Sequence, residues 1–404
     1  MDCTVSSDLV NTGPNNVALV RPWTQEEFES SSTQWSDLLA RSEADPLFMS
    51  WEWQWLWWKH HCIPQDSELY VLAGYNDAGV LVGLAPLYLH RATHRGLSAR
   101  RLESIGSSFR ERAQVFSEYL DLIIDVRYVD SFLKALGEVI SGDPRWNDLV
   151  FANTPVDGHA AHLLKVHLRD HYVRDADPLT SYSVALPADF ASYVSSLDSD
   201  TRRRAWNQRK KLVNPQLVEI HVAQVDEALN LIDRFHKQRW GQSHYVGFRR
   251  LFNRAFAQLM GRRGELHITE LHSDGRPLNV MYNVRVGGRE YNIQSGFDAN
   301  AGKGISPGYL HLGFALERAS EHGVKTFDFL AGKGLNRDYK RDFCTQPKQL
   351  ITLQSIRTKA LAWLYRGYDK RFIRSLGTLG PPIGLLTDAM VSLDSISEST
   401  AGFY

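Results

Sequence analysis

Two stretches of the chain, about two hundred residues apart, share a pattern of apolar strands around a polar turn. Residues 68–90, ELYVLAGYNDAGVLVGLAPLYLH, predict two strands joined by the turn residues at 76–79. Residues 265–286, ELHITELHSDGRPLNVMYNVRV, begin with the same Glu-Leu pair and turn at 273–275. Because the interval is about half of the chain, the repeat predicts duplication of one α/β domain.

The rest of the sequence pattern predicts where the two domains begin and end. A polar leader at 1–16 is expected to be disordered, and a strand at VALVRPW follows it. We expect an N-terminal domain over 17–177 and a C-terminal domain over 178–357. Residues 358–404 are expected to form a basic helix and an irregular tail.

The segment PLFMSWEWQWLWWKHH, which starts at residue 46, is rich in tryptophan. Ser50 is a plausible N-cap and Glu52 suits a first helical turn, so we expect a helix, although the alternation also fits a strand. Aromatic side chains dominate core energetics, which favours a buried helix. The alternative is the wall of a substrate groove.

Composition narrows the function classes. Lys and Arg together number 46, as do Asp and Glu, so no global field attracts nucleic acid or an anionic membrane. Three dispersed cysteines and the absence of a signal peptide or a long apolar run indicate a cytoplasmic protein without membrane insertion. The sets 60–62 and His167 with His171 lack a complete group of ligands, so we expect no metal site.

Arginine and lysine recur between 202 and 211, in the segment TRRRAWNQRKK. One interpretation is a solvated basic helix. The other is a surface that grips the phosphate groups of a carrier or of nucleic acid.

A possible anion site follows the three strands of the second half. Residues 296–319, GFDANAGKGISPGYLHLGFALERA, predict a strand end, a glycine-containing loop and a helix. Ser306 is a candidate cap and Pro307 suits the first turn, where unpaired N–H groups attract anions. Neither G-x-x-x-x-G-K-[ST] nor G-x-G-x-x-G is present, so the two common nucleotide-binding loops are absent from the sequence.

The order of these elements resembles the core of the Gcn5-related N-acetyltransferase fold. The motifs YNIQSGFD, SPGYLHLGFALERASEHGVKTFDFLAGKG and YKRDF, with Arg239-Trp240 and the tryptophan-rich segment, resemble a family of acetyltransferase-like proteins associated with bacterial cellulose and exopolysaccharide biosynthesis. That family is related to the peptidoglycan aminoacyl transferases, which carry two such domains in tandem. The resemblance covers roughly 45–357 and is strongest over 235–343. It implies an α/β fold of two tandem acetyltransferase-like domains, each a mixed, mostly antiparallel sheet flanked by helices.

The resemblance implies an N-acyltransferase that moves an acyl group from acyl-coenzyme A to an amine, with a small molecule or sugar nucleotide as acceptor in surface polysaccharide biosynthesis. The usual pyrophosphate loop is replaced by KGISPGYLH, which leaves a longer acyl thioester or an aminoacyl-tRNA donor open. An aminoacyl-tRNA-dependent transferase would use 202–211 to hold tRNA. A further alternative is a non-catalytic scaffold within a polysaccharide synthesis complex, with a donor pocket filled by side chains.

The resemblance also assigns residues. Tyr339, expected in a loop, is the candidate acid for the leaving thiolate, and Asp328 would orient the nucleophile or accept its proton. Alternative roles are a packed aromatic for Tyr339, a loop-anchoring acceptor for Asp328, a solvated charge for Lys340 and a structural pair for Arg239-Trp240. The donor-binding candidates are Gln294, Ser295, Gly296, Ser306, Gly308, Tyr309 and Lys340, and the acceptor-binding candidates are Arg239, Trp240 and Trp51.

Overall fold

The structure of the protein is a computed structural model. It describes residues 16–65, 67–94, 97–109, 115–169, 171–331 and 335–367, so the expected leader, apart from its last residue, and most of the expected tail lie outside the described residues. The described residues fall into two compact units, divided between residues 355 and 356. The second unit is helical over 359–367.

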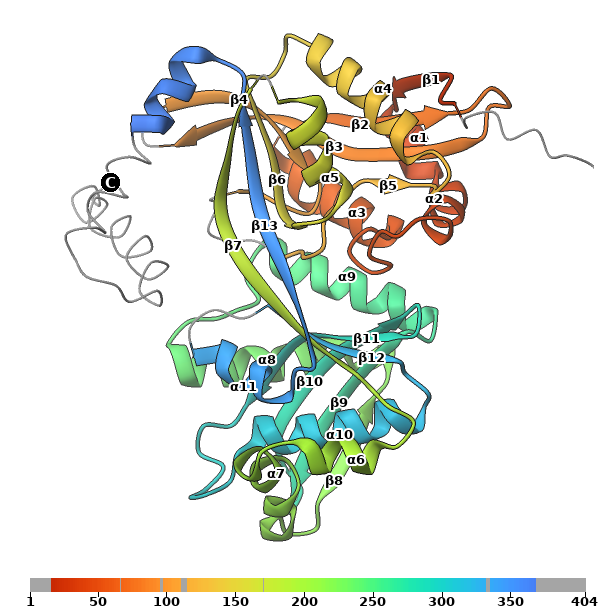
Figure 1. The fold of residues 1–404 in the computed structure, drawn as a ribbon. Coiled ribbons are helices and arrows are strands. Elements are labelled where there is room, and N and C mark those ends of the chain that lie inside the picture. The colour runs from red at the N-terminus through yellow and green to blue at the C-terminus, as the bar shows by residue number, and fades with distance from the viewer. Residues whose placement is uncertain are drawn as a thin grey trace, which may run out of the picture. The chain divides into compact units, whose positions relative to one another are not determined.

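The first half of the larger unit combines strands with short helices (Figure 1). Its strands are β1 (Leu19–Pro22), β2 (Glu68–Tyr75), β3 (Leu81–His94), β4 (Leu97–Ser104), β5 (Ile123–Ile124), β6 (Asp148–Pro155) and β7 (Tyr172–Ala185). Its helical segments are α1 (Gln25–Ser30), α2 (Ser32–Ala40), α3 (Trp51–Trp57), η1 (Trp58–Cys62), η2 (Ile63–Gln65), α4 (Val129–Gly142), α5 (His159–His162) and η3 (Leu163–His167).

The helical segments of the second half are α6 (Phe190–Ser196), α7 (Ser199–Ala205), η4 (Asn207–Lys211), η5 (Val222–Gln224), α8 (Val225–Trp240), α9 (Phe248–Arg262), α10 (Pro307–Glu321) and α11 (Leu335–Phe343). The strands are β8 (Gln216–Ile220), β9 (Leu266–Ser273), β10 (Arg276–Val286), β11 (Arg289–Phe297), β12 (Thr326–Ala331) and β13 (Gln346–Ile356). Residues 335–343, expected as part of a loop, are thus helical.

The two halves present the same order of strands. In each half an antiparallel hairpin, β2–β3 or β9–β10, leads into a third strand, β4 or β11. A helix then precedes a strand that pairs parallel to that third strand, as β6 does with β4 and β12 with β11. The expected mixed, mostly antiparallel sheet with flanking helices is confirmed.

In the described part of the chain, thirteen strands join into one sheet, and twelve of them follow the order β1-β2-β3-β4-β6-β13-β7-β12-β11-β10-β9-β8. The last strand of each half is exchanged: β7 pairs with β12, and β13 lies between β6 and β7. Figure 1 shows these two long strands running between the two groups of strands. The expected boundary between 177 and 178 falls inside β7, and the division into two domains stays a prediction.

The tryptophan-rich helix α3 belongs to the core. Ser50 caps it as expected, because its Oγ accepts the Trp53 N–H at 3.2 Å. Trp53 is 1% exposed and meets the rings of Phe252 and Phe256 edge-on, at 4.8 Å each. The buried-helix interpretation is therefore the one that the packing supports.

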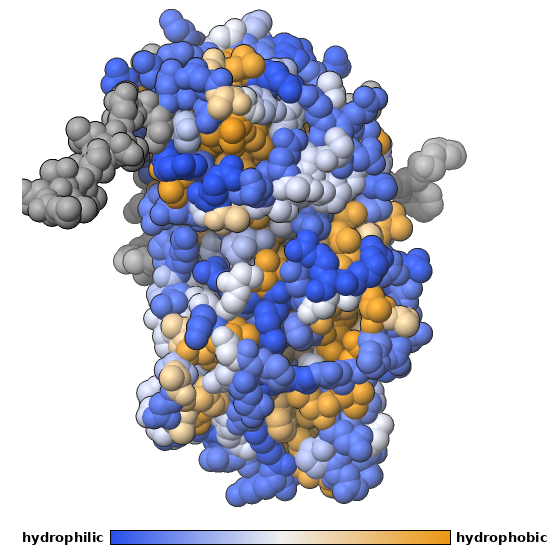
Figure 2. All heavy atoms as spheres, turned by 90° about the vertical axis from the view of Figure 1, so that its right-hand side faces the viewer, coloured by the Kyte–Doolittle hydropathy of each residue, from blue (hydrophilic) through white to orange (hydrophobic). Residues whose placement is uncertain are grey.

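The molecular face in Figure 2 is largely hydrophilic, with apolar patches scattered between polar ones. Within the described ranges, we find no helix whose length and apolar character would let it cross a bilayer.

Candidate functional site

The parallel strands β11 and β12 separate soon after they start. Their pairing covers Arg289–Tyr291 opposite Thr326–Asp328, whereas β11 continues to Phe297 along β10. β12 changes register with β7 between Asp328 and Leu330, and Leu330 has a left-handed φ of 59°. The far part of β11 therefore has an edge that β12 does not cover.

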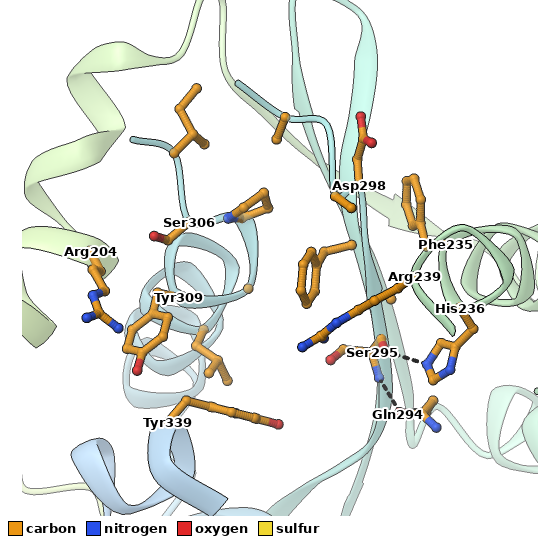
Figure 3. A pocket seen from close by; sticks show the side chains of 18 of the residues that line it. Arg204, Phe235, His236, Arg239, Gln294, Ser295, Asp298, Ser306, Tyr309 and Tyr339 are labelled. Carbon is orange, nitrogen blue, oxygen red and sulfur yellow. Dashed lines mark hydrogen bonds between the residues drawn. The ribbon is translucent and has the colours of Figure 1, made fainter. Parts of the chain in front are cut away.

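A pocket of about 560 Å³ lies along this edge, a volume typical of small-molecule sites (Figure 3). Side chains from α8, β11, the loop after β11, the start of α10 and α11 line it, together with Arg204 of α7. The predicted site residues among them are Arg239, Trp240, Gln294, Ser295, Gly296, Ser306, Gly308, Tyr309 and Tyr339.

Helix α10 directs its N-terminus at the pocket. Pro307 occupies the first turn as expected, but Ser306 makes no side-chain cap; instead its backbone N–H donates to Gln208 Oε1 at 3.0 Å. The first N–H groups of a helix have no partner inside it, so those of Gly308 and Tyr309 remain donors. A Cβ on Gly308 would meet nothing nearer than Phe297 Cδ1 at 3.8 Å, which leaves open space beside these groups.

Two arginines add positive charge. The Arg204 guanidinium lies 4.9 Å from the centre of the Tyr309 ring and pairs with Asp200. The Arg239 guanidinium lies 4.7 Å from the centre of the Phe297 ring and 4.6 Å from that of Trp240. A helix N-terminus and two guanidinium groups thus converge on one cavity, an arrangement that suits a phosphate-bearing ligand.

Two tyrosines stand between these charges. Their rings are 6.3 Å apart, and the Tyr309 hydroxyl donates to Asp342 Oδ2 at 2.7 Å. Burial raises the pKa of Tyr339 to about 12, although Arg239 acts in the opposite direction. The Tyr339 phenol therefore keeps its proton at neutral pH.

Two histidines that were not predicted as site residues contact the strand β11: His236, which lines the pocket, and His244 beside it. His236 donates from Nε2 to the Ser295 carbonyl at 3.2 Å, and Gln294 Oε1 accepts the Ser295 N–H at 3.0 Å. The Gln294 amide in turn donates to His244 Nε2 at 2.8 Å. Side chains therefore satisfy both backbone groups of Ser295 at the uncovered edge. The spacing of His236 and Arg239, three residues apart on one predicted helix, was the signal that could have found His236.

Asp328, Lys340 and Trp51 are not among the residues that line the pocket. Trp51 stacks on Trp55 at 6.0 Å and donates its indole N–H to the Phe28 carbonyl. Asp328 is fully buried and accepts the Leu330 N–H at 2.8 Å, the loop-anchoring role that was its alternative. Burial raises the pKa of its carboxyl group to about 6.

Lys340 is 8% exposed, so it is neither a solvated charge nor a group on the pocket wall. Because α11 is helical, neighbouring side chains diverge by roughly 100°, and Lys340 turns into the interior while Tyr339 faces the pocket. Burial lowers the pKa of its amine to about 8, against the attraction of Glu118 and Asp328.

The basic segment 202–211 makes many contacts within the protein. Arg202 donates to the carbonyls of Ser195 and Leu197, and Arg203 and Arg204 both pair with Asp200. Arg209 pairs with Glu317 at 2.7 Å, and Lys211 donates to the Gly304 carbonyl at 3.0 Å. The segment thus fastens α7 and η4 to α10 and to the loop before it.

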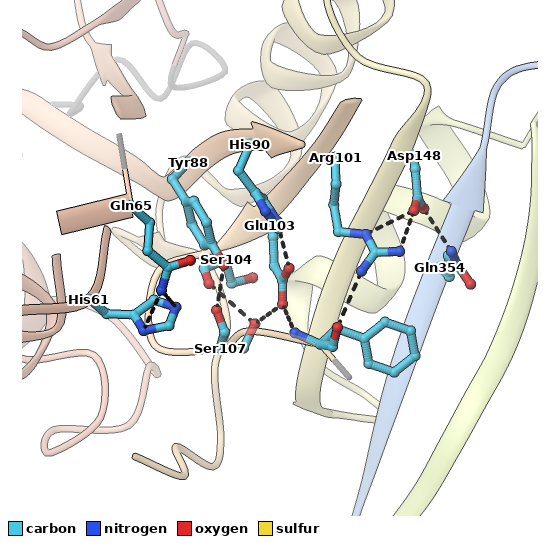
Figure 4. Close-up of polar contacts among 11 residues, drawn as sticks. His61, Gln65, Tyr88, His90, Arg101, Glu103, Ser104, Ser107, Asp148 and Gln354 are labelled. Atoms are coloured by element: carbon cyan, nitrogen blue, oxygen red, sulfur yellow. Dashed lines mark hydrogen bonds and ion pairs between the residues drawn. The ribbon is translucent and has the colours of Figure 1, made fainter. Parts of the chain in front are cut away.

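A second polar cluster lies in the first half (Figure 4). Glu103 accepts from Ser107 Oγ at 2.8 Å and lies 3.1 Å from His90 Nε2. The described residues contain no group of three His, Cys, Asp or Glu side chains arranged to hold a metal ion. His61, considered for metal spacing, lies within hydrogen-bond distance of Gln65.

Comparison with known proteins relates the residues around this pocket to a known family. Residues 199–341 match the family described as an acetyltransferase (GNAT) domain, and every residue that lines the pocket falls within that range. The C-terminal half carries a GNAT-like acetyltransferase domain. The search of curated proteins found no match.

Solved structures share the fold of the GNAT-like domain and of the half before it. A crystal structure of FemX is 11% identical and has a TM-score of 0.57, with 86% of this chain and 99% of that chain covered. A conserved protein of unknown function from Bacteroides thetaiotaomicron VPI-5482 is 11% identical and has a TM-score of 0.51, with 85% and 100% covered. At these identities the likeness shows the fold alone.

Proposed function

We propose that the protein is an N-acyltransferase that takes its acyl group from an acyl-coenzyme A thioester. One observation carries the proposal: a single pocket joins the N-terminus of α10, two arginines, the uncovered edge of β11 and a protonated tyrosine. The match of residues 199–341 to an acetyltransferase domain supports it.

The donor's phosphates would lie at the start of α10. The N–H groups of Gly308 and Tyr309 would bind their oxygens, and Arg204 and Arg239 would balance their charge. Lys340 has no part in this contact because its amine faces the interior.

The thioester would lie beside Ser295, where its carbonyl oxygen replaces Gln294 Oε1 as acceptor of the Ser295 N–H. A neutral amine attacks the carbonyl carbon, the C–N bond forms and the C–S bond breaks. Tyr339 gives its proton to the leaving sulfur, and the proton released by the amine returns the tyrosinate to phenol by way of solvent. The bonds and protons balance, and the products are an amide and a free thiol.

The acceptor that we propose is the amine of a sugar nucleotide or another surface-polymer precursor, and this finer assignment rests on the sequence resemblance. An aminoacyl-tRNA donor is the first alternative. Arg202 donates to the Leu197 carbonyl and Arg203 pairs with Asp200, which leaves fewer free cations for tRNA in that segment. A non-catalytic scaffold is the second alternative, and the open space beside Gly308 argues against it.

Coenzyme A binding and thiol release test the proposal through Gly308 and Tyr339. In the Gly308→Asp variant, a carboxylate stands among N–H groups that face an anion, so calorimetry should show coenzyme A affinity reduced by more than about tenfold. The matched control is Gly308→Ala, which adds a Cβ without charge and should bind coenzyme A like the parent.

The Tyr339→Phe variant should have the opposite signature. Coenzyme A binding stays near that of the parent, and thiol release from acyl-coenzyme A with a panel of amines falls by about 10²- to 10⁴-fold. If the parent binds neither coenzyme A nor its acyl derivatives, the proposal is wrong. A parent that binds aminoacyl-tRNA instead would support the first alternative.

A further inference from the structure

Lys340 anchors helix α11 to the end of β12. Its Nζ donates to the Leu330 carbonyl at 3.2 Å and to the Ala331 carbonyl at 2.6 Å. Ala331 is the last residue of β12, and α11 begins four residues later, at Leu335. The contact therefore ties the helix to the strand through residues that do not line the pocket.

A residue of the first half of the chain, Glu118, binds the same peptide group between Leu330 and Ala331. Glu118, 1% exposed, accepts the Ala331 N–H on Oε1 at 2.7 Å and on Oε2 at 2.9 Å. Ser181 of β7 donates to Glu118 Oε2 at 2.9 Å, which fixes the carboxylate from a second direction. Ala331 is thus held through its N–H by Glu118 and through its carbonyl by Lys340.

A buried network supports this pair of contacts. The Tyr119 hydroxyl lies 2.6 Å from Ser181 Oγ and 2.9 Å from Asp328 Oδ2. Arg289 Nη1 stands 3.5 Å from Asp328 Oδ2 and 3.5 Å from Asp45 Oδ2. Residues from both halves of the chain therefore share one set of buried charges around the point where β11 and β12 separate.

We propose that Glu118 and Lys340 are positioning residues, which clamp the Ala331 peptide and so direct Tyr339 into the donor pocket. The orientation of Lys340 fixes that of Tyr339, because adjacent side chains on a helix keep a constant angle of roughly 100°. The first half of the chain then sets the geometry of the chemical step in the second half. This inference rests on the proposed function, in which Tyr339 is the proton donor.

A double-mutant cycle tests the clamp. In the parent background, Lys340→Met should reduce thiol release by about 10- to 100-fold, since small displacements of a catalytic group are costly, and coenzyme A affinity should change by less than about twofold. In the Tyr339→Phe background, the same substitution should cause little further loss, because the misplaced group is already gone. Glu118→Gln, a near-isosteric change, should behave in the same way.

The control is Lys325→Met, which removes an exposed lysine just before β12 and should leave turnover unchanged. Parent-like turnover in both Lys340→Met and Glu118→Gln would overturn the inference. So would equal losses of turnover in the parent and Tyr339→Phe backgrounds, because that result indicates a role independent of Tyr339.

Hydrogen exchange gives a readout that does not need activity. Amides of residues 335–343 should exchange at least about tenfold faster in Lys340→Met and Glu118→Gln than in the parent, with those of α9 unchanged. If the parent fails to bind coenzyme A, the proposed function fails while this measurement still decides whether the clamp exists. Unchanged exchange over 335–343 in both variants would refute the clamp.

Discussion

His236 lines the pocket, and the ring of His244 lies beside it, with the two ring centroids 4.7 Å apart. Burial lowers the pKa of both imidazoles, and that of His244 falls to about 4. A neutral His244 accepts a hydrogen bond from Gln294, and Gln294 in turn accepts the Ser295 N–H. The backbone that would face a donor carbonyl is therefore held in place by a neutral histidine.

This arrangement predicts acid sensitivity. The folded-state pKa of His244 lies below its ordinary value of 6.5, so its contribution to stability is present above pH 6.5 and is lost as the pH falls towards 4. Between pH 7 and pH 4, the free energy of unfolding should fall by roughly 2–3 kcal/mol more in the parent than in His244→Gln. Urea titrations at several pH values measure the difference.

Exposed His221 provides the control, because His221→Gln should follow the parent at every pH. The raised pKa values of Glu118 and Asp328 act in the opposite direction as the pH falls, but both carboxylates are present in parent and variant and cancel in the comparison. An identical pH profile for parent and His244→Gln would show that folding does not change the pKa of His244, and would contradict the lowered value.

At the residue scale, the sequence predicted the pocket residues whose positions follow from the order of neighbouring elements along the chain. Gln294, Ser306 and Tyr309 follow a strand, a loop and a helix start, and these elements meet at one pocket. Lys340 was misplaced because YKRDF was expected in a loop, where its amine was free to reach a phosphate. The helix turns that amine inward instead. Trp51 could not be placed, since the tryptophan-rich pattern favours a buried helix but does not show whether any one of its side chains reaches a groove.

Among the elements, α10 carries both the turn that we propose binds the donor and a close contact with α7. A Cβ built on Gly313 would come within 2.5 Å of the Ala205 carbonyl oxygen, so the glycine allows the two helices to approach. Arg209 covers the same contact, with its guanidinium 3.7 Å from the centre of the Phe314 ring. Arg204 precedes Ala205, and the helix contact thus sets where this arginine meets the pocket.

Gly313→Ala should therefore destabilise the protein. The methyl group forces α7 away from α10, at a cost of about 1–3 kcal/mol in the free energy of unfolding. Gly308→Ala is the matched control in the same helix, because its Cβ has room and alanine favours the helix by up to about 1 kcal/mol. Thermal or urea unfolding compares the two, and a Gly313→Ala variant as stable as Gly308→Ala would contradict the packing argument.

The elements themselves were largely readable from their periodicity and turn residues. The two hairpins and helix α10 follow from alternating apolar residues, from Gly and Asp in the turns, and from Pro307. Ser306 was expected to cap α10 with its side chain. Instead, its backbone N–H donates to the side chain of Gln208, which belongs to η4. Such a contact depends on how η4 packs on the loop before α10, and local sequence does not contain that information.

For the whole molecule, the exchange of β7 and β13 is the feature that no local sequence pattern predicts. A strand's sequence specifies its faces but not its neighbours, so KQLITLQSI predicted a strand without a partner. In the structure, Gln354 of β13 donates to Asp148 of β6 at 2.8 Å, and Arg101 of β4 donates to the same carboxylate (Figure 4). Arg174 of β7 donates to Gln354 Oε1 at 3.1 Å.

The exchanged strands should make the two halves unfold together. Each half contributes its last strand to the other half's part of the sheet, so neither group of strands keeps all its partners when the other half unfolds. We expect a single urea transition, with coincident midpoints for circular dichroism and for tryptophan fluorescence, which reports mainly on the tryptophan-rich first half. Gln354→Ala removes a buried link between β6, β13 and β7 and should lower both midpoints equally, by about 1–3 kcal/mol in the free energy of unfolding. Gln346→Ala, at an exposed position at the start of the same strand, should leave them unchanged. Two separate transitions in the parent would mean that the halves are independent domains despite the exchange.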